Sequence, residues 1–337
     1  MLNLYMLLFY FMLAFGTFTA ISANSWFVTW VGLEINLLAF MPLMSNSFNK
    51  QSSEATIKYF LTQAMASTVF IFGSLFYTML SHSHYMIMES TGSFITCLAM
   101  LLKIGMAPFH FWLPEVTNGS NWKNTLIMLT WQKIAPMMII FNMTLNPMIL
   151  VVMILTSSII SGIQGLNQTC LRKIMAYSSI NHSSWMMASL MTSLTLWLSY
   201  FMIYLLINLN IIFTFNKFNI MNIKQMNNLL NNNKTLKFTF MTNFLNLGGL
   251  PPFLGFLPKW LVVMSLAKNN LEFLSFTLII FTLISLFFYI RITLTTFTTS
   301  HEETLIKAYN KLSYPYSFMN MMLATSLLLC TLMTNYI

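Results

Sequence analysis

Long apolar segments follow one another along almost the whole chain, separated by short polar stretches. Each is close to the length of about 20 apolar residues that a helix needs to cross a bilayer. The longest polar stretch, at 216–236, is predicted to be a loop. The pattern predicts about eleven membrane-spanning helices, at 2–21, 26–44, 59–80, 93–113, 124–142, 148–166, 174–191, 194–215, 237–267, 273–297 and 316–336.

The composition supports this interpretation and excludes a soluble globular protein. Of the 337 residues, 57% are hydrophobic and 7% are charged, whereas soluble domains carry about 25% charged residues. Eleven spans leave no room for a nucleotide-binding or catalytic domain. Cys97, Cys170 and Cys330 contain no C-x-x-C pair, which argues against a disulfide framework and a metal site. We therefore expect an all-α, polytopic membrane protein that binds no metal.

Lysine and arginine residues gather in alternate connections between the predicted helices. Eleven belong to the group that includes the chain start, 45–58, 114–123, 167–173, 216–237 and 298–315, and Arg291, which reaches the same side, makes twelve. The opposite group holds Lys268 alone. Loops on the cytoplasmic or matrix side of a membrane carry such an excess. The distribution predicts an inside N-terminus and an outside C-terminus. The formal net charge of +9 therefore indicates membrane topology rather than a nucleic-acid partner.

Two of the segments carry more than one proline: Pro108 and, at its end, Pro114 in the fourth, and Pro251, Pro252 and Pro258 in the ninth. Because proline removes a backbone donor and clashes with the preceding turn, both helices should be broken. The motifs GMAPFHFWLP, from residue 105, and GLPPFLGFLP, from residue 249, align at a constant offset of 144. The motifs lie an odd number of helices apart, so the chain passes them in opposite directions, as in inverted repeats around an ion pathway. We expect two inverted five-helix repeats with broken helices, at 1–142 and 148–297, and a C-terminal helix at 316–337.

Four ionisable residues lie within apolar segments: Glu34, Lys103, Lys133 and Lys259. Each costs roughly 2.5–3.5 kcal/mol at the centre of a membrane helix. Snorkelling to the interface explains one such lysine taken alone, but four ionisable groups in one chain favour a polar path for protons. Burial disfavours the ammonium form, so a neighbouring charge can decide whether a lysine keeps its proton. Glu34 is the expected partner of Lys103.

Two histidines also lie within apolar segments. His182 belongs to the polar stretch at 177–185, where a hydrogen bond between packed helices and a proton relay are equally good explanations. His110 lies on the first broken helix and could join the proton path. The two histidines give no facing pair of axial ligands, so we do not expect a haem protein.

Several motifs carry a specific resemblance: GLEIN at 32–36, LKIGMAPFHFWLPEV at 102–116, TWQKIAP at 130–136 and GGLPPFLGFLPKW at 248–260. With them, the chain resembles, nearly end to end, the NADH-ubiquinone oxidoreductase chain 2 family, the antiporter-like membrane subunits of mitochondrial respiratory complex I. Its composition is insect-like. The resemblance implies a proton-translocating subunit of the mitochondrial inner membrane, with its N-terminus in the matrix and its C-terminus in the intermembrane space.

The same resemblance implies roles for individual residues. Glu34 corresponds to the family's essential glutamate and Lys103 to its partner on the first broken helix. Lys133 corresponds to the lysine of the central axis, Lys259 to the lysine of the second broken helix, and His182 to a histidine near that axis. Lys103 precedes its proline motif whereas Lys259 follows its own, so the two half-channels should not be equivalent.

The resemblance also implies the partners. NADH, FMN, iron–sulfur clusters and ubiquinone are expected to bind other subunits of the complex, so no cofactor is expected in this chain. The expected partners are those subunits, including neighbouring antiporter-like membrane subunits, and lipids such as cardiolipin, but no nucleic acid. Two alternatives stay open: a stand-alone cation/proton antiporter, and a structural subunit that only bridges pump modules.

Overall fold

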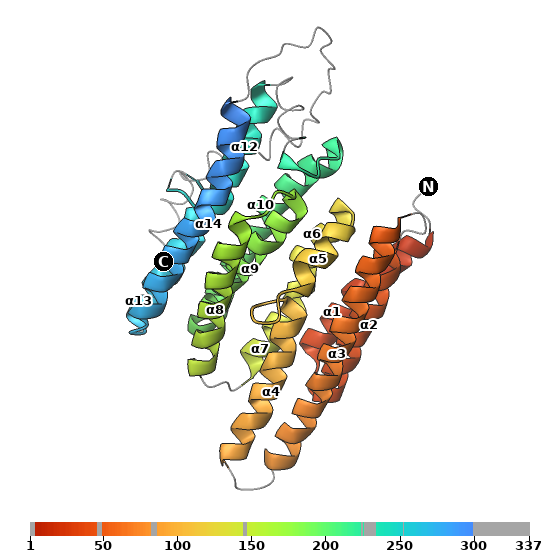
Figure 1. Ribbon diagram of the computed structural model, residues 1–337. Helices are drawn as coiled ribbons and strands as arrows, with labels where there is room; N and C mark the ends of the chain where they lie inside the picture. Colours follow the sequence, from red (N-terminus) through yellow and green to blue (C-terminus); the bar gives the residue numbers. More distant parts are fainter. Residues whose placement is uncertain are drawn as a thin grey trace. The chain divides into compact units, whose positions relative to one another are not determined.

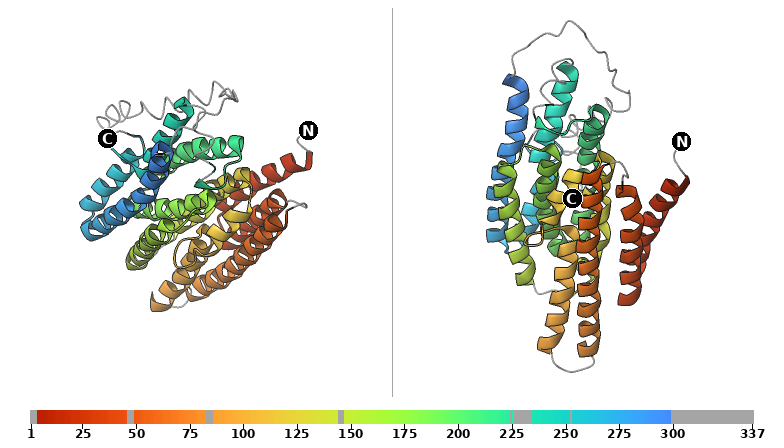
Figure 2. Two further views of the ribbon diagram at one scale, coloured as in Figure 1. Left: turned by 45° about the horizontal axis from the view of Figure 1, so that its top comes forward. Right: turned by 45° about the vertical axis from the view of Figure 1, so that its right-hand side comes forward.

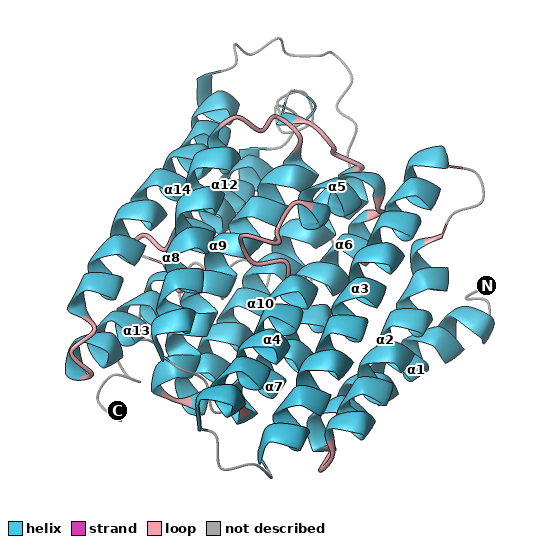
Figure 3. Cartoon of the chain, turned by 60° about the horizontal axis from the view of Figure 1, so that its bottom comes forward, coloured by secondary structure: helices cyan, strands magenta, loops and turns pink. Residues whose placement is uncertain are grey.

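The computed structural model describes residues 4–45, 49–81, 86–143, 147–223, 225, 234–251 and 253–298. Within these ranges the regular structure is helical, apart from one isolated bridge between Cys170 and Asn222 (Figure 3). The backbone divides into two compact units, Met1–Ser157 and Ser158–Ile337. The all-α fold expected from the sequence is confirmed for the described residues.

The first unit is a bundle in which α3 packs along α4 and α1 packs along α2 (Figures 1 and 2). The α1–α2 pair is very close, because a β-carbon on Gly32 would lie 2.6 Å from the backbone nitrogen of Ala20. Small residues allow such close approach between membrane helices. The helices of this unit are α1 (Leu4–Ser22), α2 (Trp26–Met44), α3 (Lys50–Ser81), α4 (Met86–Ile104), α5 (Trp112–Gly119), α6 (Trp122–Leu129) and α7 (Trp131–Asn142).

The second unit is organised around α9 (Leu171–Thr192), which contacts α10, α13 and α14. From Leu171 to Leu190, every residue of α9 except Lys173 is buried. The other helices are α8 (Pro147–Leu166), which begins before the boundary between the units, α10 (Leu194–Phe218), α12 (Lys234–Gly248), α13 (Phe256–Lys268) and α14 (Glu272–Thr298).

The predicted segments agree well with the helices, but the number that qualify as membrane spans is smaller. Six described helices are long and apolar enough to cross a membrane by length and composition: Leu4–Ser22, Trp26–Met44, Lys50–Thr78, Pro147–Leu166, Leu194–Phe218 and Glu272–Leu294. The predicted helix at 316–336 lies outside the described residues. The other four segments differ because three are interrupted and because α9 is rich in serine and other polar residues.

Both segments predicted to be broken are broken, and the breaks have the same local geometry. Helix α4 ends at Ile104 before Gly105 (φ 77°), and α12 ends at Gly248 before Gly249 (φ 74°). In each case the next two backbone N–H groups bond back to the last turn, which is the pattern of a Schellman cap. The following helices begin at Trp112 and Phe256. End and restart therefore repeat at the same offset of 144 that relates the sequence motifs.

A third interruption was not predicted from the sequence. The segment at 124–142 was expected to be one helix, but α6 ends at Leu129 and α7 begins at Trp131. Thr130 lies between them with φ −118° and ψ −71°, and its hydroxyl donates to the Leu126 carbonyl at 2.7 Å. Pro136 lies inside α7, where it removes one backbone donor. A backbone weakened by proline and a hydroxyl bonded to the preceding turn together account for the interruption.

Candidate functional site

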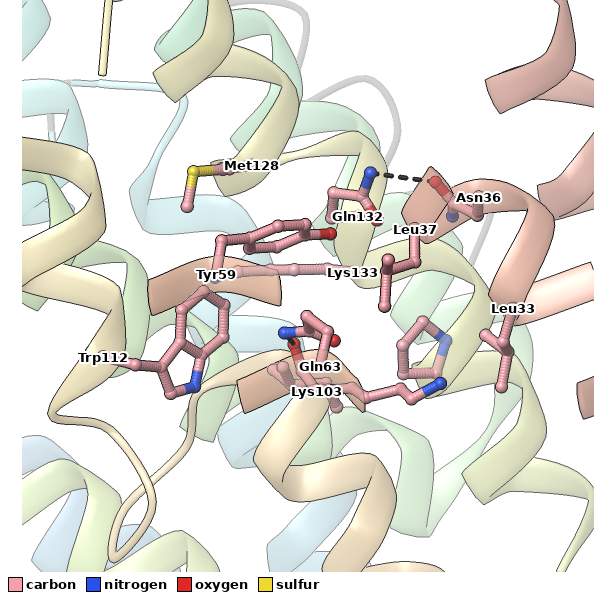
Figure 4. A pocket seen from close by; sticks show the side chains of 12 residues that line it. Leu33, Asn36, Leu37, Tyr59, Gln63, Lys103, Trp112, Met128, Gln132 and Lys133 are labelled. Atoms are coloured by element: carbon pink, nitrogen blue, oxygen red, sulfur yellow. Dashed lines mark hydrogen bonds between the residues drawn. The ribbon is translucent and has the colours of Figure 1, made fainter. Parts of the chain in front are cut away.

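A buried cavity lies within the first unit. The cavity has a volume of about 20 Å³. About 10–15 Å³ is enough to hold one water molecule. Two of the predicted lysines, Lys103 and Lys133, line this cavity together (Figure 4). The full lining is Leu33, Asn36 and Leu37 of α2, Tyr59 and Gln63 of α3, Lys103 and Ile104 of α4, Trp112 of α5, Met128 of α6, and Gln132, Lys133 and Pro136 of α7.

Lys103 lies in the last turn of α4, directly before the break. It is 7% exposed, and in Figure 4 its ammonium end reaches toward the side of the cavity where Leu33 lies. The carbonyl groups freed by the break are bonded by side chains from neighbouring helices. Trp112 donates its indole N–H to the Leu102 carbonyl at 3.0 Å, and Gln63 donates to the Lys103 carbonyl at 3.4 Å. These two hydrogen bonds therefore fix the conformation of the last turn of α4 around Lys103.

Lys133 lies in the first turn of α7, just after the interruption at Thr130. It is 2% exposed and belongs to the largest fully buried side chains of the described residues. Burying an ammonium group so completely is costly unless water or polar groups surround it. The cavity that Lys133 shares with Lys103 provides room for such water.

Glu34 lies on α2 beside the residues that line the cavity. Its side chain is partly buried, and its carboxylate interacts electrostatically with Lys103. The two groups do not form a direct ion pair, since the ion pair found among the described residues joins Lys58 to Glu115. Their attraction therefore acts across a gap, where a change of charge on one side chain is felt by the other.

The polar residues of the lining connect the helices that carry the charged groups. Gln132, next to Lys133, donates a hydrogen bond of 2.9 Å to Asn36, two residues after Glu34 (Figure 4). Asn124 of α6 donates to the Leu43 carbonyl of α2 at 2.8 Å. These bonds fix α2 against α6 and α7, so the position of Glu34 depends on them.

The structure does not bring His110 to the cavity. His110 is 1% exposed in the connection between α4 and α5, where its ring contacts Phe111. Its carbonyl accepts the Leu113 N–H at the start of α5. His110 is thus part of the break itself, and it is not among the residues that line the cavity.

Lys259 occupies the second break, within the other unit. It is 8% exposed and lies in the first turn of α13, from which its ammonium donates to the Gly248 carbonyl at 2.9 Å. Gly248 ends α12, so Lys259 bonds the backbone across the break. A β-carbon on Gly249 would lie 2.9 Å from the Lys259 Nζ, so the lysine packs where a side chain at 249 would be.

His182 lies in the middle of α9, and it is 6% exposed. Its Nδ1 lies 2.9 Å from the hydroxyl of Tyr200, and its ring lies 5.1 Å from that of Tyr204. Both tyrosines belong to α10. His182 is therefore hydrogen-bonded between packed helices, which fits the packing role and also gives it a partner for proton transfer.

Sequence reasoning missed most of the neutral polar lining. Asn36 and Gln132 stand in the quoted motifs, but no role was assigned to them. Gln63, the one glutamine within the segment at 59–80, carries a signal that was overlooked, because an uncharged amide within an apolar span needs a partner. Tyr59 and Trp112 gave no such signal, since aromatic residues are frequent throughout the chain.

Among the described residues, no group of three or more histidine, cysteine or acidic side chains is arranged to hold a metal ion. The chemistry that the described charged groups offer is the gain and loss of protons. Glu34, Lys103 and Lys133 are grouped in the first unit, and Lys259 and His182 lie in the second.

Comparison with known proteins gives a consistent result. The family model described as NADH:quinone oxidoreductase/Mrp antiporter, TM, matches residues 23–285. The chain is 44% identical to NADH-ubiquinone oxidoreductase chain 2 of Anopheles gambiae over 298 residues, which are 88% of this chain and 87% of the relative. It is 41% identical to the protein of the same name from Locusta migratoria over 329 residues, 96% of this chain and 95% of the relative.

Solved structures share the fold at lower sequence identity. A chain of respiratory complex I from Thermus thermophilus superposes with a TM-score of 0.87 at 23% identity, covering 98% of this chain and 79% of that one. A chain of the Mrp complex from Dietzia sp. gives a TM-score of 0.78 at 12% identity, covering 96% of this chain and 74% of that one. At these identities the likeness concerns the fold alone.

Proposed function

This chain belongs to the NADH:quinone oxidoreductase/Mrp antiporter family, and within it to NADH-ubiquinone oxidoreductase chain 2, and from that premise we propose that its buried lysines carry protons through the membrane. It is an antiporter-like membrane subunit of complex I, and therefore part of NADH:ubiquinone oxidoreductase. It is a mitochondrial, multi-pass membrane protein. The energy for proton movement comes, in this proposal, from quinone reduction in other subunits.

The single observation that carries the proposal is that Lys103 and Lys133 line one buried cavity, with Glu34 electrostatically coupled to Lys103. Two ammonium groups that share one cavity repel each other, so a proton on one lysine weakens proton binding at the other. The carboxylate of Glu34 opposes this effect at Lys103.

A working cycle follows from these couplings. With Glu34 ionised and near, Lys103 holds its proton; when the carboxylate is neutralised or withdrawn, the proton passes through water in the cavity toward Lys133. Each transfer takes one proton from one amine and gives it to the next acceptor, so charge and atoms balance. Lys259 and His182 are the acceptors that we assign to the second half of the path. His110 stays outside this scheme, because it does not line the cavity.

The repeated architecture supports two half-channels. We infer two inverted five-helix repeats, 1–142 and 148–297, because the helix ends of α4 and α12 and the starts of α5 and α13 recur at one offset. The starts of α3 and α10, Lys50 and Leu194, differ by the same 144 residues. The halves are chemically different, since the position equivalent to Lys259 is Glu115, which is exposed and bonded to Lys58 at 2.7 Å.

The remaining features of the proposal concern the surroundings of the chain. We place it in the inner membrane, with its basic loops and N-terminus in the matrix and its C-terminus in the intermembrane space. Its partners are neighbouring antiporter-like subunits and lipids such as cardiolipin. NADH, FMN, the iron–sulfur clusters and ubiquinone belong to other subunits.

The test replaces Lys103 by alanine in the intact complex, reconstituted in vesicles. We expect fewer protons moved per NADH and slower NADH oxidation, because the two are coupled. Lys123→Ala is the matched control, since Lys123 is exposed in the first turn of α6. Unchanged proton transfer in Lys103→Ala would contradict the proposed proton path and would favour the alternative that this chain is a structural subunit that only bridges pump modules. The stand-alone antiporter predicts instead that the purified chain dissipates a cation gradient without its partners.

A further inference from the structure

The core of the second unit contains a cluster of tyrosines that the proposed path does not yet use. Tyr200 and Tyr204 of α10 and Tyr289 of α14 are 1%, 2% and 1% exposed. We call these three residues the phenol cluster. Tyr289 lies within the range of electrostatic interaction with both Tyr200 and Tyr204. All three belong to Ser158–Ile337, so the cluster is a feature of one unit.

One end of the cluster touches His182. The hydroxyl of Tyr200 lies 2.9 Å from His182 Nδ1, which is a good hydrogen-bond distance. Tyr204 contributes its ring, with its centroid 5.1 Å from the imidazole centroid. The histidine is thus held by two tyrosines of α10, one of which is directly bonded to a ring nitrogen that can gain or lose a proton.

The other end of the cluster lies at the second break. A β-carbon on Gly248 would lie 3.7 Å from Cδ2 of Tyr289, so the tyrosine ring packs against this residue. The carbonyl of the same Gly248 accepts the hydrogen bond from the Lys259 ammonium at 2.9 Å. The ring of Tyr289 and the ammonium of Lys259 therefore lie against different atoms of the same residue, and water is needed to join the phenol oxygen to the amine.

The hydroxyl of Tyr289 has a further property that a purely structural tyrosine rarely has. It is buried, yet it makes no hydrogen bond of good geometry with the described residues, although it lies near Ser178. The Ser178 hydroxyl donates to the Met175 carbonyl at 2.7 Å, and its oxygen keeps lone pairs that can accept from Tyr289. Buried hydroxyl groups in folded proteins almost always bond to protein or to ordered water. The oxygen of Ser178 and a water molecule beside Tyr289 are the two partners that can accept or donate a proton here.

We propose that Tyr200 and Tyr289 relay protons between His182 and Lys259 through their hydroxyl groups and adjoining water. The inference rests on the proposed function, because it needs both end groups to carry protons. A phenol that receives a proton on its oxygen gives up its own proton on the other side in the same step. One O–H bond forms and one breaks, so no phenol remains charged. Phenylalanine has the same ring and cannot take part.

The opposing interpretation is that the three tyrosines only fill space between α9, α10 and α14. Replacing tyrosine by phenylalanine distinguishes the relay from this packing interpretation, because the replacement keeps the ring and removes the hydroxyl oxygen. Tyr177→Phe is the matched control: Tyr177 is a buried tyrosine of α9 whose β-carbon packs toward Gly165 of α8, and it is not a member of the proposed relay. Lys259→Ala tests the proposed function itself.

The experiment measures NADH oxidation and protons moved per NADH for Tyr200→Phe, Tyr289→Phe, Tyr177→Phe and Lys259→Ala in the intact complex in vesicles. Rates are expressed per assembled complex, and the pH profile of turnover is recorded. We expect both relay variants to slow proton-coupled turnover about tenfold or more and to change the pH profile. Tyr177→Phe should retain the activity and pH profile of the unaltered chain.

The outcomes are distinct. If Lys259→Ala lowers proton transfer while both relay variants match the control, the relay is refuted and the proposed function stands. If Lys259→Ala is also without effect, the second half of the proposed path fails and the relay fails with it. Since Tyr200 and Tyr289 lie on different helices, loss of assembly in one variant leaves the test to the other.

Discussion

Gln132 donates a hydrogen bond of 2.9 Å to Asn36 and thereby ties the helix that carries Lys133 to the helix that carries Glu34. The two residues are 96 positions apart in the chain. Their bond sets the spacing of the charged groups on either side of it. The proton chemistry of the first unit thus depends on a contact between two uncharged side chains.

Replacing Asn36 by leucine should disturb proton transfer much more than stability. Hydrogen bonds between membrane helices average about 0.6 kcal/mol, so the complex should assemble and its melting temperature should fall only slightly. The Gln132 amide then loses its acceptor beside the cavity, and Glu34 loses its fixed position. We expect a clear loss of protons per NADH, measured in vesicles. An unaffected proton yield would show that the bond has no part in placing Glu34.

Substitutions at Lys133 can distinguish a need for its positive charge from a need for its gain and loss of a proton. Lys133→Met removes both, whereas Lys133→Arg keeps a positive charge that arginine cannot release within a protein. If Lys133 hands protons on, both variants should lower proton-coupled NADH oxidation, by about tenfold or more. The measurement is turnover per assembled complex. Wild-type activity in the arginine variant would mean that only the charge is needed.

Glu34 and Lys103 should behave as one functional pair. Glu34→Gln removes the negative charge with little change of shape, and we expect lower proton transfer, as for Lys103→Ala. The double variant should lose less than the sum of the two single losses in activation free energy, because interacting residues are not additive. Glu34→Asp serves as the control that keeps the carboxylate. Fully additive losses would contradict an electrostatic coupling between the two groups.

Gly249 should resist replacement for reasons that can be measured apart from activity. Its φ of 74° costs an alanine about 1–2 kcal/mol. The new β-carbon would also lie 2.9 Å from the Lys259 Nζ. We expect Gly249→Ala to lower the melting temperature of the assembled complex and to impair proton transfer. In Gly162→Ala, the control, the nearest atom lies 3.5 Å from the new carbon, so both quantities should change little.

Much of the fold followed from the sequence because the physics of lipid leaves few choices. Helix α2 has the predicted bounds of 26–44, and the prolines located both breaks correctly. The interruption at Thr130 escaped prediction, because a single proline six residues later gives only a weak signal. The C-terminal segment at 316–336 lies outside the described residues, so its helix stays a prediction.

The candidate site was predictable in its charges but not in its geometry. An ionisable group within an apolar run is conspicuous, and this singled out Glu34, Lys103, Lys133 and Lys259. That Lys103 and Lys133 share a cavity could not be read from the sequence, because it depends on how α4 packs against α7. His110 was included only because it lies within a break, and its side chain proved to contact Phe111.

The burial of α9 has a consequence for how the chain is made. This helix carries five serines, an asparagine and a histidine, and every residue from 174 to 190 is buried. A segment of that polarity gains little from entering hydrocarbon by itself. We expect α9 to stay within or beside the insertion machinery until α10 and α14 have been synthesised and can pack around it. Insertion of the second unit into the membrane is therefore expected to be cooperative, because its most buried helix is stabilised by helices that are synthesised after it.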